Sequence, residues 1–395
     1  MCFLSGQFFQ FLIPDQRCQH YTANLEFISF SCHNFCLSKN HSDDKIYSEM
    51  QQQTLIRPDD WHLHLRDSPY LESVLPHTAA QFERAIIMPN LNPPVTTCQL
   101  ASDYLQRITA ALPENSRFQP LMTLYLTDNT NPVEIVTASQ SDFIFAAKLY
   151  PAGATTNSDD GVTHINKISA VLEAMQKHQL PLLVHGETTA TNVDVFDREK
   201  VFIDQTMIKL RQDFPDLRIV FEHITTSEAV NFILSENQNI AATITPHHLM
   251  INRNAIFQGG LRPHHYCLPV AKREVHRLAL VLAATGKSKK FFAGTDSAPH
   301  SQHAKESACG CAGIYSAFCA IELYAEVFEQ ANNFNNFENF MSRNGSEFYR
   351  LAQNSDTITL QKAEWQIPEK LDFANTNIIP FHAGHTLQWK LVQSQ

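Results

Sequence analysis

The sequence has no apolar run of 18 or more residues, so it offers no candidate for a transmembrane helix. It also has no cluster of lysines and arginines: 30 basic residues stand against 40 acidic ones, and the formal net charge is −10. A nucleic-acid partner is therefore not expected, because binding a phosphate backbone requires a positively charged surface. An anionic small molecule remains compatible with this charge, since it needs only a locally positive pocket.

Disulfide-forming spacings are absent as well. The nine cysteines are odd in number and scattered, and four of them lie within the first 49 residues. Cys309 and Cys311 are separated by one glycine but lack a second pair at zinc-finger spacing. We therefore interpret the cysteines as reduced, mostly buried thiols and expect a cytoplasmic protein without a membrane partner.

The first 49 residues differ in composition from the rest of the chain. They are rich in phenylalanine and cysteine, and they lack both the basic start of a signal peptide and the arginines of a mitochondrial presequence. Met50 stands directly before a run that leads into the first predicted strand. We therefore expect Met50 to be the natural start, residues 1–49 to be a read-through or disordered extension, and residues 50–395 to form a single domain.

From residue 60 onward, short apolar runs alternate with longer amphipathic segments. Near-continuous apolar runs are typical of parallel strands that are covered on both faces. Eight β–α repeats over about 240 residues match a (β/α)8 TIM barrel in count and size. A doubly wound open sheet is the alternative, but no Gly-x-Gly-x-x-Gly turn follows any run. The predicted strands are 61–65, 84–89, 119–126, 143–150, 181–185, 218–224, 240–245 and 289–295.

Helices are predicted most clearly over 164–178, 196–213, 226–236 and 271–286, between the apolar runs. After the barrel, residues 355–392 alternate polar and apolar side chains in two or three short pieces. That pattern predicts a small terminal β extension that packs against the barrel.

The first predicted strand carries two histidines, His62 and His64, in the run Trp61–Asp67. Side chains alternate along a strand, so His62 and His64 point to one face while Leu63 and Leu65 point to the other. Two imidazoles that converge on one point form half of a transition-metal site.

Further polar residues stand where other predicted strands end. The carboxyl ends of barrel strands meet at one rim, which is where barrel enzymes carry their catalytic groups. So many polar side chains at the mouth of apolar strands are hard to explain by packing, because burying them without partners costs free energy. These residues are Asn90, Lys148, His185, His223, Asp296 and His300.

Four histidines and one aspartate exceed the ligand set of one four-coordinate zinc ion. Two ions about 3.5–4 Å apart, bridged by hydroxide and a protein group, would use them all. Lys148 then has two possible roles, because an ammonium group is repelled by two dications. It either lies further away and binds substrate, or it is neutralised by carboxylation to a carbamate that bridges the ions. The spacing alone does not decide between these roles.

Several sequence blocks resemble those of the bacterial-type, single-domain dihydroorotases of the amidohydrolase superfamily, and the resemblance runs from Thr54 to the C-terminus. The blocks occur in the expected order and at the expected separations. They are RPDDWHLHLRD at 57–67, MPNLNPPVTT at 88–97, AAKLYPAGATTNSDDGV at 146–162, LLVHGE at 182–187, FEHITT at 221–226, ATITPHHLM at 242–250 and GTDSAPH at 294–300.

This resemblance implies an enzyme of pyrimidine biosynthesis that interconverts N-carbamoyl-L-aspartate and L-dihydroorotate at a binuclear zinc centre. His62, His64 and Asp296 would bind one zinc ion and His185 and His223 the other, with hydroxide and a carboxylated Lys148 as bridges. Asp296 would also be the general acid and base. The substrate would be bound by His64, Arg66, Asn90, His185, His300 and the backbone of Leu268 and Ala312, under a mobile loop that contains Thr155 and Thr156.

Other functions are compatible with parts of this pattern. A hydantoinase-like cyclic amidase would share the barrel, a metal deaminase would lack Lys148, and an inactive scaffold barrel should have lost ligands. His247 stands where the resemblance leads us to expect a different polar side chain, and His247 and His248 are candidates for contacts to the metal ligands. A homodimer is implied by the family only.

Overall fold

The computed structural model describes residues 51–392 of the 395-residue chain. The expected start at Met50 and the expected extension over residues 1–49 lie outside the described residues. Within 51–392, no helix combines the length and the apolar character that crossing a bilayer requires.

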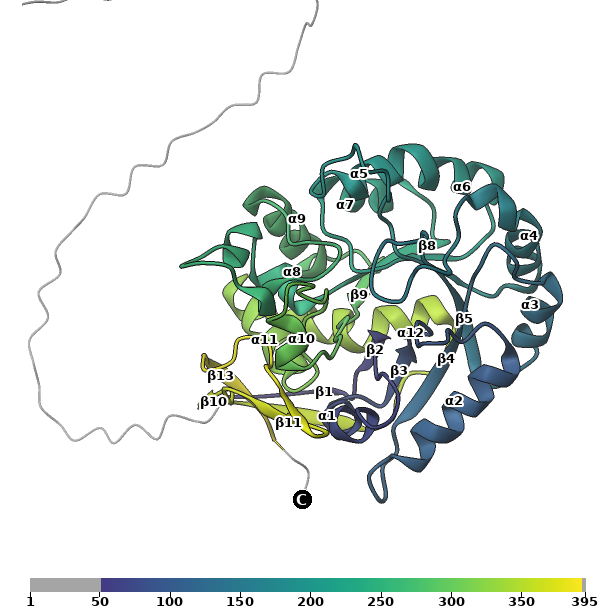
Figure 1. Cartoon of the computed structure of the whole chain (residues 1–395). Helices are drawn as coiled ribbons and strands as arrows, with labels where there is room; N and C mark the ends of the chain where they lie inside the picture. Colours follow the sequence, from purple (N-terminus) through teal and green to yellow (C-terminus); the bar gives the residue numbers. More distant parts are fainter. Residues whose placement is uncertain (1–50, 393–395) are drawn as a thin grey trace, which may run out of the picture. The chain divides into compact units, whose positions relative to one another are not determined.

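Eight parallel strands form one sheet whose spatial order follows the chain order (Figure 1). Each of the eight predicted apolar runs overlaps with a strand. Most strands are shorter than the runs, because the apolar sequence continues beyond the strand into the neighbouring loop. They are β2 (Asp59–Leu63), β3 (Arg84–Ile87), β4 (Gln119–Tyr125), β5 (Ile144–Leu149), β6 (Leu182–Val184), β7 (Ile219–Phe221), β8 (Ile240–Ile244) and β9 (Phe291–Ala293).

The first and last strands of this sheet meet just beyond their carboxyl ends. Leu63 forms a parallel bridge with Ser297, and the amide of His64 donates to the Ser297 carbonyl at 3.2 Å. The amide of Asp296 donates to the His62 carbonyl at 2.9 Å. These bonds turn the sheet into a barrel, and they tie together the two segments that carry His62, His64 and Asp296. The predicted (β/α)8 barrel is confirmed.

One buried side chain from each strand fills the barrel interior. This layer consists of Trp61, Ile86, Leu121, Ala146, Leu183, Val220, Ala241 and Phe292. Below it Tyr349, from α12 (Asn344–Tyr349), stacks on Trp61 with 4.5 Å between ring centroids. The interior is therefore packed at the amino end of the strands and leaves room for a site only at their carboxyl end.

The helices surround the sheet, and their apolar faces share the larger core with the outward side chains of the strands (Figure 1). The predicted helix 196–213 runs through a π-helical turn, Ile203–Met207, between α5 and α6. The helices are α1 (Leu71–Gln81), α2 (Cys98–Ala110), α3 (Pro132–Ser139), α4 (Ser169–His178), α5 (Arg198–Phe202), α6 (Ile208–Asp213), α7 (Ser227–Ser235), α8 (Pro246–Met250), α9 (Glu274–Thr285), α10 (Gln302–Lys305), α11 (Ala320–Gln330) and α12.

The predicted terminal β extension is present and is larger than a hairpin. The strands β10 (Thr357–Gln366) and β13 (Thr386–Val392) pair antiparallel, and β1 (Gln52–Ile56) pairs with the other edge of β10. The strands β11 (Leu371–Phe373) and β12 (Thr376–Ile378) form a separate hairpin. β1 was not predicted, because its polar Gln52 and Gln53 do not form an apolar run.

Candidate active site

A bulge in β2 directs His62, and His64 just after the strand, into the barrel. Asp60 lies opposite Ala85 and Leu63 opposite Ile87, so β2 contains one residue more than β3 between these pairs. Leu63 packs in the outer core, as the predicted alternation requires, whereas Trp61 packs in the interior layer. The extra residue therefore allows Trp61 to fill the barrel while His62 and His64 point toward its mouth.

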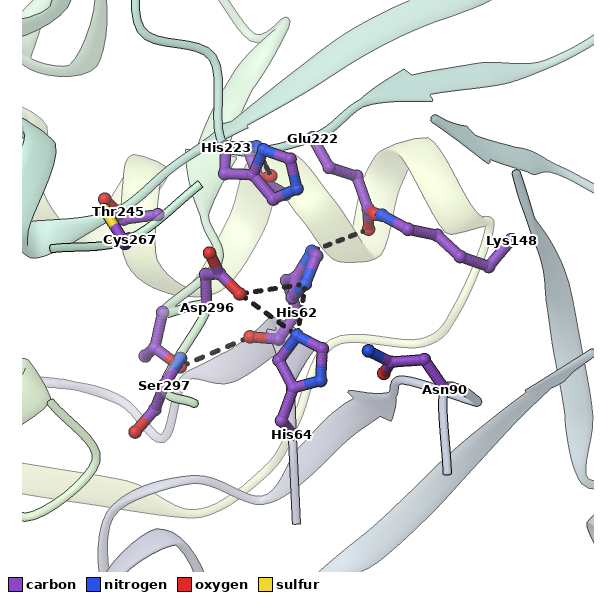
Figure 2. Close-up of polar contacts among 12 residues, drawn as sticks. His62, His64, Asn90, Lys148, Glu222, His223, Thr245, Cys267, Asp296 and Ser297 are labelled. Carbon is purple, nitrogen blue, oxygen red and sulfur yellow. Dashed lines mark hydrogen bonds and ion pairs between the residues drawn. The ribbon is translucent and has the colours of Figure 1, made fainter. Parts of the chain in front are cut away.

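His62, His64 and Asp296 form a compact triangle of potential ligand atoms (Figure 2). Nε2 of His62 lies 3.3 Å from Nε2 of His64, and Oδ1 of Asp296 lies 3.3 Å from the first and 3.1 Å from the second. Two nitrogens bound at about 2.0–2.1 Å to one tetrahedral zinc ion lie about 3.3–3.4 Å apart. The donor set and its spacing therefore fit one face of a zinc coordination sphere.

Two backbone features make room for this triangle. Asp296 has a φ of 43°, in the left-handed region that a non-glycine residue rarely adopts, and this directs its carboxylate inward. Gly294 lies two residues earlier on the inward face, where a Cβ atom would come within 2.7 Å of Thr243 and 3.1 Å of His62. A side chain at position 294 would push His62 out of place.

His185 and His223 lie beside the triangle. The ring of His223 is 5.0 Å from that of His62 and 4.8 Å from that of His185, measured between centroids. Ligand atoms of His62, His223 and Asp296 all lie within 4.8 Å of one another. His223 reaches this position because its φ of 40° turns it inward, and its amide donates to Oγ1 of Thr243 at 2.7 Å.

Lys148 approaches the same centre from β5 and is completely buried, with 0% exposure. Its Nζ contacts Oε2 of Glu222, whose other oxygen lies 3.1 Å from Nδ1 of His62. Burial lowers the pKa of Lys148 well below its ordinary value. Lys148 does not line the pocket, so its side chain is not placed to bind a substrate carboxylate directly.

The carboxylate of Asp296 is held in its ionised form. Burial by itself would raise its pKa, but the charge of His62 and the hydrogen bonds from His62 and His64 bring the pKa well below the ordinary value. Burial lowers the pKa of His64 to about 3, so this imidazole is neutral near pH 7 and can bind a cation.

Above these residues lies a pocket with about 340 Å³ of free space, part of which is open to solvent. Six of the seven predicted substrate-binding residues line it, and so do both predicted loop threonines. The lining includes His62, His64, Arg66, Asn90, Tyr150, Thr155, Thr156, His185, His223, Cys267, Leu268, Asp296 and Ala312.

The seventh predicted substrate-binding residue, His300, contacts the pocket through Arg66. Nη2 of Arg66 lies 3.0 Å from Nε2 of His300. This His300 nitrogen also lies 3.0 Å from the carbonyl oxygen of Ala312. Burial and the charge of Arg66 lower the pKa of His300 to about 2. His300 is therefore neutral. Within residues 51–392, the guanidinium of Arg66 bonds to His300 and to the Pro299 carbonyl and has no carboxylate partner.

The loop that contains Thr155 and Thr156 already touches the opposite wall of the pocket. Nδ2 of Asn90 donates to the Thr156 carbonyl at 3.0 Å, and Oγ1 of Thr156 donates to the Ala312 carbonyl at 3.4 Å. Asn157 donates in return to the Asn90 carbonyl at 3.0 Å. These few polar contacts hold the loop over the site.

Sequence reasoning missed two carboxylates that orient predicted ligands. Glu222 contacts His62 and Lys148, and Oε2 of Glu187 lies 3.0 Å from Nε2 of His185. The signal for Glu222 was available, because it follows the inward-facing Val220 by two residues and so shares its face of the strand. His247 and His248 do not line the pocket; His248 contacts Thr245 and Pro269 instead.

Comparisons with known proteins agree with this fold. A sequence model of the amidohydrolase family matches residues 54–365. A dihydroorotase of Acaryochloris marina is 60% identical over 343 residues, which cover 87% of this chain and 99% of that relative. The structure of a Campylobacter jejuni dihydroorotase is 38% identical with a TM-score of 0.80, and the match covers 88% of this chain and 99% of that one. The structure of a Saccharomyces cerevisiae dihydroorotase in complex with 5-fluoroorotic acid is 35% identical with a TM-score of 0.81, and the match covers 87% of this chain and 98% of that one.

The chain therefore belongs to the amidohydrolase family of metal-dependent barrel enzymes, and within that family to the dihydroorotases. The class of enzyme expected from the sequence motifs is confirmed: a hydrolase that acts on carbon–nitrogen bonds in cyclic amides, in pyrimidine biosynthesis.

Proposed function

We propose that this pocket interconverts L-dihydroorotate and N-carbamoyl-L-aspartate with two zinc ions per subunit. The observation that carries the proposal is that the His62–His64–Asp296 triangle and Arg66 line one pocket, and that the Arg66 guanidinium lacks a carboxylate partner within residues 51–392. A metal centre and a carboxylate-binding cation in one pocket are what hydrolysis of a cyclic amide with a carboxylate substituent requires.

His62, His64 and Asp296 would hold one ion, and His185 and His223 the other. Oε1 of Glu222 lies 3.1 Å from Nδ1 of His62, so its charge favours a proton on that nitrogen and leaves Nε2 free to bind a cation. When bound, the ions would lower the pKa of water toward neutrality and polarise the ring carbonyl.

Lys148 would help to hold the ions as a carbamate formed with CO2. Carboxylation requires a neutral amine, and complete burial favours the neutral form of Lys148. A carbamate converts a cation that would repel the two ions into an anion that attracts both. The alternative, an ammonium that binds substrate, is disfavoured because Lys148 does not line the pocket.

Arg66 binds the carboxylate of the substrate, together with Asn90 and His300. Its planar guanidinium matches a carboxylate with two parallel hydrogen bonds. The Leu268 and Ala312 backbone groups lie on the same lining, and His64 and His185 form the floor. Thr155 and Thr156 close over the bound molecule and exclude water.

Asp296 carries the proton during turnover. In ring opening, water adds to the amide carbonyl carbon while Asp296 accepts its proton, and Asp296 then delivers that proton to the ring nitrogen as the carbon–nitrogen bond breaks. In ring closure, Asp296 removes a proton from the ureido nitrogen as this nitrogen attacks the carboxyl carbon, and then delivers the proton to the hydroxyl of the carboxyl group, whose carbon–oxygen bond breaks to release water. Its low pKa keeps it ionised and ready to accept a proton near pH 7.

The proposal includes a cytoplasmic homodimer. The five cysteines of the described residues, Cys98, Cys267, Cys309, Cys311 and Cys319, are all free thiols, which suits a reducing compartment. The dimer is carried over from the family resemblance.

A matched pair of substrates tests the proposal. Dihydrouracil is dihydroorotate without the carboxylate, so we expect its kcat/KM to be roughly 10²–10⁴-fold lower than that of dihydroorotate, because Arg66 is left unpaired. Metal analysis of the same protein should find two zinc ions per chain. Equal rates on the two substrates would favour a hydantoinase-like amidase, and no turnover of either with two ions bound would favour an inactive scaffold.

A further inference from the structure

A second cluster of potential metal ligands lies apart from the proposed centre, and one of its members, Cys267, lines the pocket. His247 and His248 belong to α8, which follows β8, and Cys267 follows the short helix Pro263–His265. All three side chains are buried, and one ligand atom from each lies within 4.8 Å of the others. We propose that His247, His248 and Cys267 form a third cation site, which binds a zinc-like ion of borderline softness.

The strongest indication comes from His247. Its side chain has 0% exposure, and neither ring nitrogen has a hydrogen-bond partner among the described residues. A buried polar atom without a partner destabilises the fold, and the imidazole carries two such atoms. Its ring neighbours are His248, with centroids 4.5 Å apart, and Phe381 at 6.1 Å. A cation bound to one of these nitrogens removes part of that cost.

The positions of Cys267 and His248 fit a shared ion. Sγ of Cys267 lies 3.6 Å from Nε2 of His248. A sulfur at about 2.3 Å and a nitrogen at about 2.0–2.1 Å from one tetrahedral zinc ion lie about 3.6 Å apart. His247 forms no hydrogen bond that would hold its ring, so a rotation can bring its nitrogen to the same ion.

The tautomer of His248 can be fixed from the other side of its ring. Nε2 of His248 lies 2.9 Å from the Pro269 carbonyl, which can only accept, so this nitrogen carries the ring proton in the structure. When an ion binds, the proton moves to Nδ1, where Oγ1 of Thr245, 2.8 Å away, can accept it, and Nε2 becomes available to the metal. Sγ of Cys267 also approaches the Pro269 carbonyl, at 3.3 Å. When an ion binds, His248 and Cys267 lose their contacts with the Pro269 carbonyl, and the Cys267 thiol releases its proton to solvent.

The cluster is accessible and its charge can be balanced. Cys267 lines the same pocket as Asp296, so a cation and a water molecule as fourth ligand can enter from there (Figure 2). Two buried amines face the cluster: Lys305 donates to the carbonyls of Tyr266, Cys311 and Gly313, each at 2.7 Å, and Lys272 donates to the Val270 carbonyl at 2.8 Å. A thiolate at Cys267 offsets one positive charge of the ion, and three protein ligands with one exchangeable position are usual for zinc.

Cobalt provides a readout that does not depend on activity. The full-length protein is stripped of metal, loaded with Co²⁺, and examined for bound cobalt and for near-ultraviolet thiolate-to-cobalt charge transfer. The proposed binuclear centre has no sulfur ligand, so this band reports only a cysteine site. We expect one cobalt ion beyond those of the centre and a band that disappears in Cys267→Ser and in His247→Gln, while the other ions remain bound.

A control addresses the exposed thiols. Sγ of Cys309 and Sγ of Cys311 lie 3.9 Å apart and could bind cobalt themselves. The band should persist in the double variant Cys309→Ser, Cys311→Ser. Absence of the band in the loaded protein, its persistence in Cys267→Ser, or its loss in the double variant would each overturn the third site. None of these outcomes depends on which substrate the enzyme uses.

Discussion

Oε1 of Glu222 lies 3.1 Å from Nδ1 of His62, and both side chains are completely buried. The second oxygen of Glu222 contacts Lys148 (Figure 2). One carboxylate therefore orients a proposed ligand of the first ion and the proposed bridge to the second. Because it touches neither the pocket nor a substrate, Glu222 is a positioning residue.

Glu222→Gln tests this role. The amide keeps the size of the side chain but removes its charge, so His62 and Lys148 are less firmly oriented. We expect zinc affinity, measured by competition with a chelator, to fall about 10–100-fold. The matched control is Glu306→Gln, because Glu306 contacts His264 at 2.9 Å outside the pocket. Equal zinc affinities of Glu222→Gln and Glu306→Gln would contradict the assignment.

Lys148→Ala removes the proposed bridge. We expect the variant to lose metal and nearly all dihydroorotate turnover, because the remaining ligands cannot offset the repulsion between two dications. A short carboxylic acid such as propionate should restore part of both, since it can enter the vacated space as an anion. Full activity with two bound zinc ions in Lys148→Ala, without added carboxylate, would end the carbamate assignment.

The barrel was predictable from sequence because each strand is a continuous apolar run, and Lys148 and His185 follow the interior residues Ala146 and Leu183 by two positions. His223 does not follow this period: it comes three residues after the inward-facing Val220 and reaches the site through its positive φ. The extra residue in β2 is likewise a property of strand pairing. Periodicity carries no information about such local departures, and for this reason strand ends were predicted less well than strands.

Asp296→Ala separates metal binding from proton transfer. Four histidines and Lys148 remain, so much of the metal should stay bound. We expect kcat to fall by about 10²–10⁴-fold, since this is what a positioned acid or base contributes. Metal content and kcat are measured on the same preparation. A kcat within tenfold of the unaltered enzyme would rule out the acid–base role of Asp296.

Arg66→Ala should impair binding more than chemistry. Removing one partner of a buried charged hydrogen-bond pair costs about 2–5 kcal/mol, and we expect the loss mainly as a raised KM for dihydroorotate. The matched control is Arg107→Ala, because Arg107 forms an exposed pair with Asp67 at 2.9 Å on the adjoining surface. If the KM of Arg66→Ala stays within about twofold of the KM of Arg107→Ala, the substrate carboxylate is bound elsewhere.

Glu322, on α11, should make stability depend on pH. Burial raises its pKa from 4.5 to about 7, although its Oε1 accepts a hydrogen bond from the Leu391 amide at 3.1 Å. The folded protein thus holds this proton to a higher pH than the unfolded chain does, so folding becomes less favourable as the pH rises from about 4.5 to about 7. Glu322→Gln keeps the acceptor for Leu391 and cannot ionise. Its advantage over the unaltered protein should therefore be small below pH 4.5 and grow to roughly 3 kcal/mol above pH 7, as measured by denaturant unfolding across this range. Parallel pH profiles for the two proteins would mean that Glu322 is ionised in the fold and that another group compensates its charge.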